Sequence, residues 1–121
     1  MSLLLHYVNI PDMNQKNYVI QPYYVEDNVY LFVFRSCFRD QDIIFVDIYK
    51  DELTEANKIR SGLRLVGNTV LTLPNYDNNF PYAIRCINKN DLILKLSPQN
   101  VSTQFMLEFE NVVESDYDNI D

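Results

Sequence analysis

Short runs of alternating apolar side chains recur along the chain, and turn-forming residues close each run after about eight to twelve residues. Successive side chains of a strand point to opposite faces, so this two-residue period is typical of strands with one buried face. Nine Tyr, seven Phe and no Trp in 121 residues also favour pleated surfaces over helices. We therefore predict an all-β fold, an antiparallel β-sandwich or a partly open small barrel with little helix.

The runs also predict how the strands are used. Pro22 removes a backbone donor, so the strand around it is expected at a sheet edge or at a bulge. The run 28–37 is apolar on both faces and is expected in the centre of a sheet, in a hairpin with 43–49. Gly62 marks a bulge or a close approach. Strand-forming runs lie at 3–10, 17–25, 28–37, 43–49, 59–66, 69–73, 82–88, 92–96 and 104–109, with longer turns at 50–58, 75–81 and 97–103.

One domain is expected, because 121 residues is close to the usual size of a single domain. We place the β domain at residues 1–110 and an acidic, flexible tail at 111–121. Six acids and no Lys or Arg occur from Glu108 onward, so like charges repel there and little apolar area is available for packing. The predicted core comprises Phe32, Val46, Ile48, Leu65, Ile84 and Leu94.

The charge balance excludes some partners. Ten basic and seventeen acidic residues give a net charge of −7, which would repel a phosphate backbone, so nucleic-acid binding is not expected. No apolar run reaches the roughly 18 residues that a membrane-spanning helix needs. The first residues lack a basic leader with a long apolar core. We expect a protein that is made in a cytoplasm and does not enter a membrane.

The residues offer little to catalysis. His6 is the only histidine, and no oriented nucleophile is signalled beside it. Cys37 and Cys86 are expected to be structural thiols, although a disulfide between them stays open because sequence does not fix their distance. The Asp clusters lack the glycine of a calcium loop, and the two glycines do not form a phosphate loop. We expect no catalytic, cofactor or metal site and no enzyme.

Tyrosine and arginine instead suggest an interface with protein, because both residue types anchor such interfaces. Exposed sides of the strands are expected to carry the Tyr side chains, with the two arginines alternating on one face. The alternative, which we give equal weight, is that these tyrosines and arginines are ordinary half-buried residues of a sheet. The candidate interface residues are Tyr23, Tyr24, Tyr30, Tyr49, Arg60 and Arg64.

Three strand patterns between Tyr30 and Phe109 resemble the small baseplate plug proteins of contractile-tailed phages. The stretch 45–49 (FVDIY) is similar to that family's aromatic-x-Asp-Ile-Tyr strand. The stretch 59–66 (IRSGLRLV) and the following 67–71 (GNTVL) resemble its next strand and turn, and 105–109 (FMLEF) resembles its closing strand. The chain departs from the family in the polar insert 51–58, which stands where a tight Asp-Gly turn is usual.

This resemblance implies a structural protein of the virion that joins the tail tube or hub to the spike. Its partners would be other tail and baseplate proteins, with a homo-oligomer also open. Two alternatives remain, an adaptor that pairs through an edge strand and a carbohydrate-binding sandwich that uses Tyr rings as sugar platforms.

Overall fold

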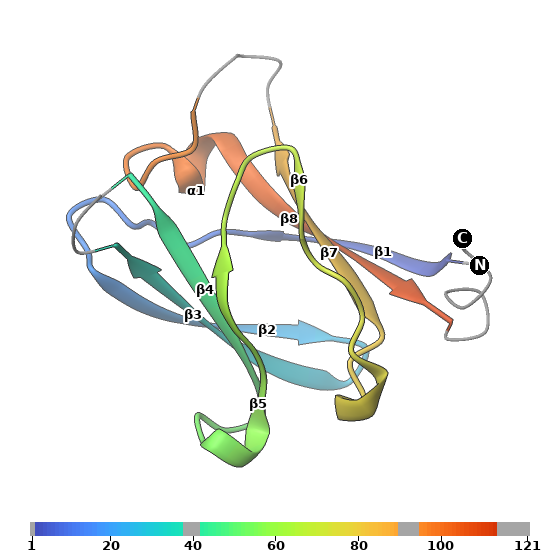
Figure 1. The fold of residues 1–121 in the computed structure, drawn as a ribbon. Coiled ribbons are helices and arrows are strands. Elements are labelled where there is room, and N and C mark those ends of the chain that lie inside the picture. The colour runs from blue at the N-terminus through green and yellow to red at the C-terminus, as the bar shows by residue number, and fades with distance from the viewer. Residues whose placement is uncertain (1, 38–41, 90–94, 114–121) are drawn as a thin grey trace.

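Two four-stranded antiparallel sheets pack face to face in the computed structural model, which describes residues 2–37, 42–89 and 95–113 (Figure 1). The strand orders are β1-β8-β7-β6 and β2-β3-β4-β5, and within the described residues no strand pair joins the two sheets. The prediction of an all-β fold is confirmed, in its sandwich form. The strands are β1 (Ser2–Asn9), β2 (Tyr18–Val25), β3 (Asn28–Ser36), β4 (Ile44–Lys50), β5 (Lys58–Arg64), β6 (Thr69–Thr72), β7 (Tyr82–Asn88) and β8 (Phe105–Val112).

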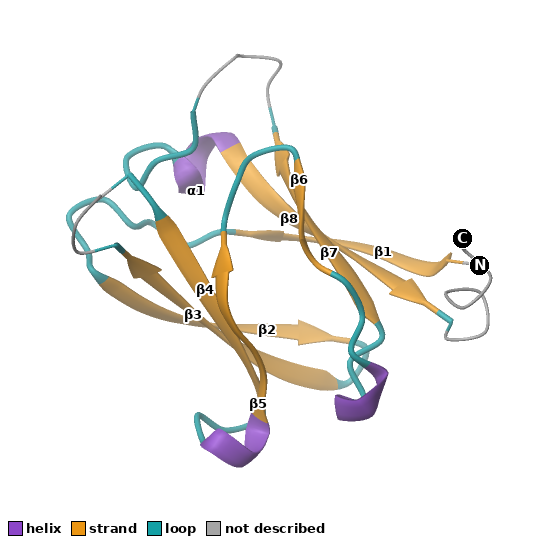
Figure 2. Ribbon diagram, viewed as in Figure 1, coloured by secondary structure: helices purple, strands orange, loops and turns teal. Residues whose placement is uncertain are grey.

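In the described part of the chain, helix is confined to three short turns between strands (Figure 2). Two are 3-10 turns, η1 (Glu55–Asn57) and η2 (Tyr76–Asn78), and the third is the four-residue α1 (Val101–Gln104). The sequence predicts only a loop at 97–103. The loop is partly helical because Val101 turns its side chain into the core, and the backbone N–H of Gln104 donates to the carbonyl of Asn100.

The chain crosses between the sheets at their edges. Strands β2 to β5 form one sheet in sequence order, and the connection from β5 to β6 passes to the other sheet. Strand β8 then pairs with both β7 and β1, so the first and last described strands lie side by side (Figure 1). The predicted β3–β4 hairpin and the edge position of β2 are confirmed.

The β2–β3 turn places Glu26, a residue that rarely adopts a positive φ, beside Asp27, which adopts it more readily. Glu26 has φ 49° and Asp27 has φ 67°, in the left-handed region that two-residue hairpin turns require. Asp is among the residues that usually fill such positions, together with Gly and Asn, whereas Glu is not. The Glu26 carboxylate accepts hydrogen bonds from the Tyr82 hydroxyl and the Asn111 amide, both at 2.7 Å. These bonds offset the backbone cost and tie the hairpin to the opposite sheet.

The core lies between the sheets and is rich in aromatic rings. Predicted core residues Phe32, Val46, Ile48, Leu65 and Ile84 are all buried. Alternation along β8 also places Phe105, Leu107 and Phe109 in the core. Leu94 lies outside the described residues. So do residues 38–41 of the expected turn at 38–42, residues 92–94 of the expected strand 92–96, and residues 114–121 of the expected tail.

The last strand is longer than the sequence suggests. Pairing with β1 continues to Val112, which lies opposite Ser2, so the ladder passes the expected boundary at residue 110 by two residues. Val112 is buried, and the Tyr76 hydroxyl donates to its carbonyl at 2.8 Å. Contacts from two other strands and from η2 therefore hold this end of β8.

Replacing Phe32 by Ala is expected to lower the free energy of unfolding by about 3–5 kcal/mol, because the cavity left behind is fully enclosed. The Phe32 ring centroid lies 4.9 Å from that of Tyr23 and 5.7 Å from that of Phe109. Urea unfolding measures the change. The matched control Leu73→Ala, at an exposed apolar residue, should shift stability by no more than about 0.5 kcal/mol. An unchanged midpoint for Phe32→Ala would contradict this core.

Candidate interaction surface

The side of the β2–β5 sheet that faces away from the core is unusually apolar. Residues at alternate positions of these strands point to it, opposite the core side chains of the same strands. We call this surface the outer face. It comprises Tyr18, Ile20, Pro22 and Tyr24 of β2, Val29, Leu31, Val33 and Arg35 of β3, Phe45, Asp47 and Tyr49 of β4, and Lys58 and Arg64 of β5.

Large apolar side chains on the outer face are exposed along strand β2. Tyr24 is 74% exposed, Tyr18 56% and Ile20 42%. Next to them on β3, Val33 is only 3% exposed, because its neighbours on both sides cover it. The cluster is therefore continuous, with a closed centre and an exposed aromatic margin.

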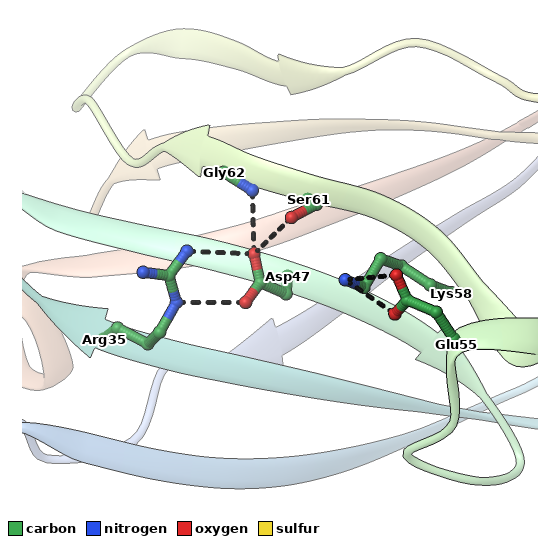
Figure 3. Close-up of polar contacts among 6 residues, drawn as sticks. All are labelled: Arg35, Asp47, Glu55, Lys58, Ser61 and Gly62. Atoms are coloured by element: carbon green, nitrogen blue, oxygen red, sulfur yellow. Dashed lines mark hydrogen bonds and ion pairs between the residues drawn. The ribbon is translucent and has the colours of Figure 1, made fainter.

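An ion pair organises the polar part of the outer face (Figure 3). The Arg35 guanidinium donates two hydrogen bonds to Asp47, from Nε to Oδ2 at 3.0 Å and from Nη2 to Oδ1 at 3.1 Å. Such a two-point contact fixes the plane of the guanidinium. Arg35 also lies over the Phe45 ring, with its Cζ 5.8 Å from the ring centroid. The charged group is thus built into the apolar surface.

Asp47 also closes a bulge in the neighbouring strand β5. The Gly62 backbone N–H donates to Asp47 Oδ1 at 2.7 Å, and the Ser61 hydroxyl donates to the same oxygen at 3.3 Å. Gly62 has φ 68°, a conformation that glycine adopts without strain, and the β4–β5 register shifts at this point. The bulge predicted at Gly62 is confirmed, and Asp47 is the residue that holds it.

These contacts decide the protonation of Asp47. Burial alone would raise the pKa of its carboxyl, but the hydrogen bonds from Arg35, Gly62 and Ser61 and the Arg35 charge together lower that pKa below its ordinary value. The outer face therefore carries a fixed, ionised and paired carboxylate at neutral pH.

A second ion pair involves Lys58 of the same face. The Lys58 ammonium is 3.0 Å from the Glu55 carboxylate and 5.7 Å from the centroid of the Tyr49 ring.

Three of the six candidate interface residues lie together on the outer face. Tyr24 is opposite Val29, Tyr49 is opposite Leu31, and Arg64 is opposite Phe45. Tyr24 and Arg64 are exposed, whereas Tyr49 is half-buried. Residues Tyr18 and Ile20, which sequence reasoning did not single out, share this face because they stand six and four positions before Tyr24 on the same strand.

Tyr23 and Tyr30 do not belong to the exposed surface, because both are buried in the core. Adjacent residues of a strand point to opposite faces, so Tyr23 and Tyr24 could not both be exposed on one face. Tyr30 lies opposite Tyr23, and it shares its face with the core residue Phe32. Burial raises the pKa of Tyr23, and it raises that of Tyr30 to about 12 with help from the nearby Glu26 and Asp51 charges.

Arg60 and Arg64 do not share a face, in contrast to the expectation from their spacing. The irregular β4–β5 register places Arg60 opposite the inward residue Ile48, whereas Arg64 is opposite the outward residue Phe45. An extra residue in a strand reverses the side on which later residues point. Arg60 is engaged within the molecule, where its guanidinium donates to Thr72 Oγ1 at 3.2 Å and to the carbonyls of Leu73 and Pro74.

The residues with catalytic or metal-binding chemistry stand apart from one another. His6 packs against the Phe109 ring at 6.4 Å between centroids, while Cys37 and Cys86 are free thiols. Burial raises the pKa of Cys86 to about 12. In the part of the chain that the structure describes, no three metal-ligating side chains gather, and no helix is long and apolar enough to cross a membrane.

Two hollows on the surface of the described residues are small compared with ligand pockets. One hollow of about 240 Å³ is lined by Met13, Lys16 and Pro98 among others, and one of about 160 Å³ by Arg64, Gly67 and Phe105 among others. Pockets for small molecules usually measure about 300–1,000 Å³. The outer face is a broader feature than either hollow, so it is the better candidate for binding.

Comparisons with known proteins identify no relative of this chain. No family model, no curated protein and no solved structure matches it.

Replacing Asp47 by Asn is expected to destabilise the protein by about 1–2 kcal/mol at neutral pH, because Arg35 loses its charged partner. The lowered pKa means that the stabilising effect of ionised Asp47 is complete above the ordinary Asp value of 3.8 and is lost as the pH falls through the folded-state pKa. The stability difference between wild type and Asp47→Asn should therefore shrink in acid.

Urea midpoints measured from neutral pH down to acid pH follow this difference. The matched control Asp77→Asn, at an exposed residue of η2, is expected to change the midpoint little. A difference for Asp47→Asn that stays constant or grows in acid would show that its charge does not stabilise the fold.

Proposed function

We propose that this protein is a non-enzymatic structural module that binds another protein through the outer face of the β2–β5 sheet. The observation that carries the proposal is a continuous apolar and aromatic surface, with Asp47 as its one acid, on a chain of net charge −7. A monomeric protein rarely exposes a large apolar patch without using it for binding. The acids of this chain therefore lie mostly elsewhere, and the outer face remains free of the repulsion that they would cause.

The composition of the outer face supports a protein partner. Aromatic and Arg side chains are enriched in the centres of interfaces, whereas unpaired charges are depleted there. Asp47 meets this requirement because Arg35 and the Gly62 N–H neutralise and satisfy it. Arg64 is exposed beside Phe45 and supplies a positive group at the margin. The partner surface would be apolar at its centre, with an acidic group near Arg64.

Rigidity supports the same conclusion. Hydrogen-bonded ladders join all four strands, and the Arg35–Asp47–Gly62 contacts lock the outer side of three of them. A preformed surface loses little conformational entropy on binding. Such a surface suits a permanent structural contact.

A carbohydrate platform fits the outer face less well. Tyr18 and Tyr24 offer exposed rings, but the residues between them on the same face are Ile20 and Pro22. A site for a polar ligand places a few convergent polar groups beside its apolar surface, and sugar hydroxyls need such partners. The apolar neighbours therefore favour a protein partner over a sugar.

The resemblance to phage baseplate plug proteins supplies the identity of the proposed partner. We propose that the module is made in the host cytoplasm and joins the virion as part of a tail baseplate, in contact with a hub, tube or spike protein. This assignment is supported by the strand patterns at 45–49, 59–71 and 105–109. The outer face includes residues of the first two patterns, namely Phe45, Asp47, Tyr49 and Arg64.

Substituting the exposed margin of the outer face should abolish the proposed binding. We expect Ile20→Glu with Tyr24→Glu to remove stable co-purification with baseplate proteins expressed from neighbouring genes, because two charges would be buried without partners in the interface. Both side chains are exposed in the free protein, so the fold should persist. Affinity purification with circular dichroism measures both effects.

The matched control places Glu at Val70, which is 52% exposed on the other sheet, and should bind like wild type. Normal co-purification of the Ile20→Glu, Tyr24→Glu variant would remove the outer face from the interface. Wild-type protein that co-purifies with none of the baseplate proteins would contradict the role in a tail.

A further inference from the structure

The four edge strands of the sandwich differ in how they are protected against pairing with another chain. An edge strand presents a row of unpaired backbone groups, and natural proteins block such rows with proline, bulges, charges or short length. Among the described residues, the edges are β2 and β5 of one sheet and β1 and β6 of the other. Three of them carry such a device.

On β2 the device is Pro22. The Ser36 N–H donates to Asn17, so odd residues of β2 face β3 and even residues face the open edge. Pro22 therefore stands where a free N–H would point outward, and it has none. Its carbonyl already accepts a hydrogen bond from the Gln21 side chain at 2.9 Å. The middle of this edge offers a partner neither donor nor acceptor.

The edges of β5 and β6 are blocked differently. Strand β5 has the Gly62 bulge, and the Gly62 N–H is taken by Asp47. It also carries three basic residues, Lys58, Arg60 and Arg64, which discourage strand pairing. Strand β6 has only four residues, and its end is followed by Pro74 and covered by the Arg60 guanidinium.

Strand β1 has only a register irregularity between Ser2 and Leu4, and its stretch from Leu4 to Asn9 has none of these devices. The strand is eight residues long, SLLLHYVN, with no proline and no acidic or basic residue other than His6. The Lys89 N–H donates to Gln104 and the Val112 N–H to Pro81, so even residues of β8 face β7 and odd residues face β1. His6 and Val8 lie opposite Phe109 and Leu107 and use their backbone groups there. Leu5 and Tyr7 therefore direct their N–H and C=O groups to the open edge.

We propose that β1 pairs antiparallel with β1 of a second copy of this chain, around a two-fold axis at His6. Leu5 of each copy then lies opposite Tyr7 of the other, and the two pairs exchange four backbone hydrogen bonds. The ladder stops near Asn9, because the Asn9 carbonyl already accepts the Tyr23 hydroxyl at 2.7 Å. The two sheets join into one sheet of eight strands across the dimer.

Self-complementarity selects a second copy as the occupant. The side chains of Leu5 and Tyr7 are 54% and 49% exposed on one side of the sheet, and the two-fold axis makes each an apolar neighbour of the other. The acids nearest to β1 lie on β8, where Glu110 is opposite Leu5 and Glu108 is opposite Tyr7. Glu110 of one copy therefore faces Glu108 of the other across three strand spacings, about 14 Å between the β8 backbones. This separation exceeds the screening length of about 8 Å at physiological salt, so the net charge of −7 does not prevent pairing here.

The experiment compares wild type with edge variants of the full chain by sedimentation velocity over a hundredfold range of concentration. Wild type should pass from monomer to dimer. Tyr7→Pro should weaken the dimer by about tenfold or more, because each copy loses one backbone N–H donor and the two-fold axis makes this two lost hydrogen bonds per dimer. The hydrogen bonds from β1 to β8 stay intact, because the Tyr7 N–H does not take part in them. Leu5→Lys gives a second variant that keeps the backbone, and Val70→Lys on β6, with similar exposure, is the matched control.

A disulfide tests the register. Around the proposed axis His6 faces His6 of the second copy in a non-hydrogen-bonded pair, with Cα atoms about 4.5 Å apart, a distance that a disulfide spans. In a Cys37→Ser background, His6→Cys should give a covalent dimer under mild oxidation. Val8→Cys, two residues along the same face, should not, and Cys86 is buried and should not react.

Several results would overturn the proposal. The proposal is wrong if the wild-type protein stays monomeric over the whole concentration range. It is also wrong if the Tyr7→Pro or Leu5→Lys variant dimerises like wild type. If Tyr24→Glu were the only variant to lose the dimer, the contact would lie on the outer face instead of on β1. Because the proposal does not depend on the proposed function, dimer formation and baseplate binding are separate readouts, and either can fail without the other.

Discussion

Edge-to-face packing of aromatic rings across the gap between the two sheets is the interaction on which the rest of the structure depends. The Phe109 ring on β8 contacts the rings of Tyr23, Phe32 and Tyr82, with centroids 5.7–6.2 Å apart. From Tyr82 the contacts continue to Tyr30 and Phe80. Of these contacts only Phe32–Phe109 is tilted, at 44°, and the others are edge-to-face, an arrangement that is favourable beyond the area it buries. They draw rings from β2, β3, β7 and β8 into one layer and so fix how the sheets face each other.

Polar groups of the inward-facing residues close the sandwich at its sides. The Tyr23 hydroxyl donates to the carbonyl of Asn9 at the end of β1, and the Arg60 guanidinium donates to Thr72 at the end of β6. At the β2–β3 turn the Tyr82 hydroxyl donates to Glu26. Buried polar atoms need partners, so each of these side chains links the sheets where its polar end emerges from the core. Two of these three contacts therefore come from residues of the aromatic layer itself, Tyr23 and Tyr82.

Strand alternation predicted most of the fold because the buried face of each strand leaves a two-residue pattern in the sequence. The same rule places Tyr23 and Tyr24 on opposite faces of β2 and places Tyr30 in the core with Phe32. Composition, which counts all tyrosines alike, does not distinguish these positions. The positions of Arg60 and Arg64 could not be predicted from alternation, because the register shifts near Gly62 that separate them depend on how β5 pairs with β4. Likewise, Asp47 holds the Gly62 bulge only once β5 lies beside β4, a contact between residues 15 positions apart.

The two sheets are equipped for different kinds of contact. On the β2–β5 sheet, Pro22 and the Gly62 bulge block both edges, while the apolar side chains of Tyr18, Ile20 and Tyr24 are exposed on the face. Any partner of that sheet must therefore bind side chains. On the other sheet the unprotected edge of β1 offers backbone groups, which recognise an extended strand of almost any sequence. The proposed partner on the outer face and the proposed second copy on β1 can therefore bind at the same time, because the first uses a sheet face and the second uses the edge of the opposite sheet.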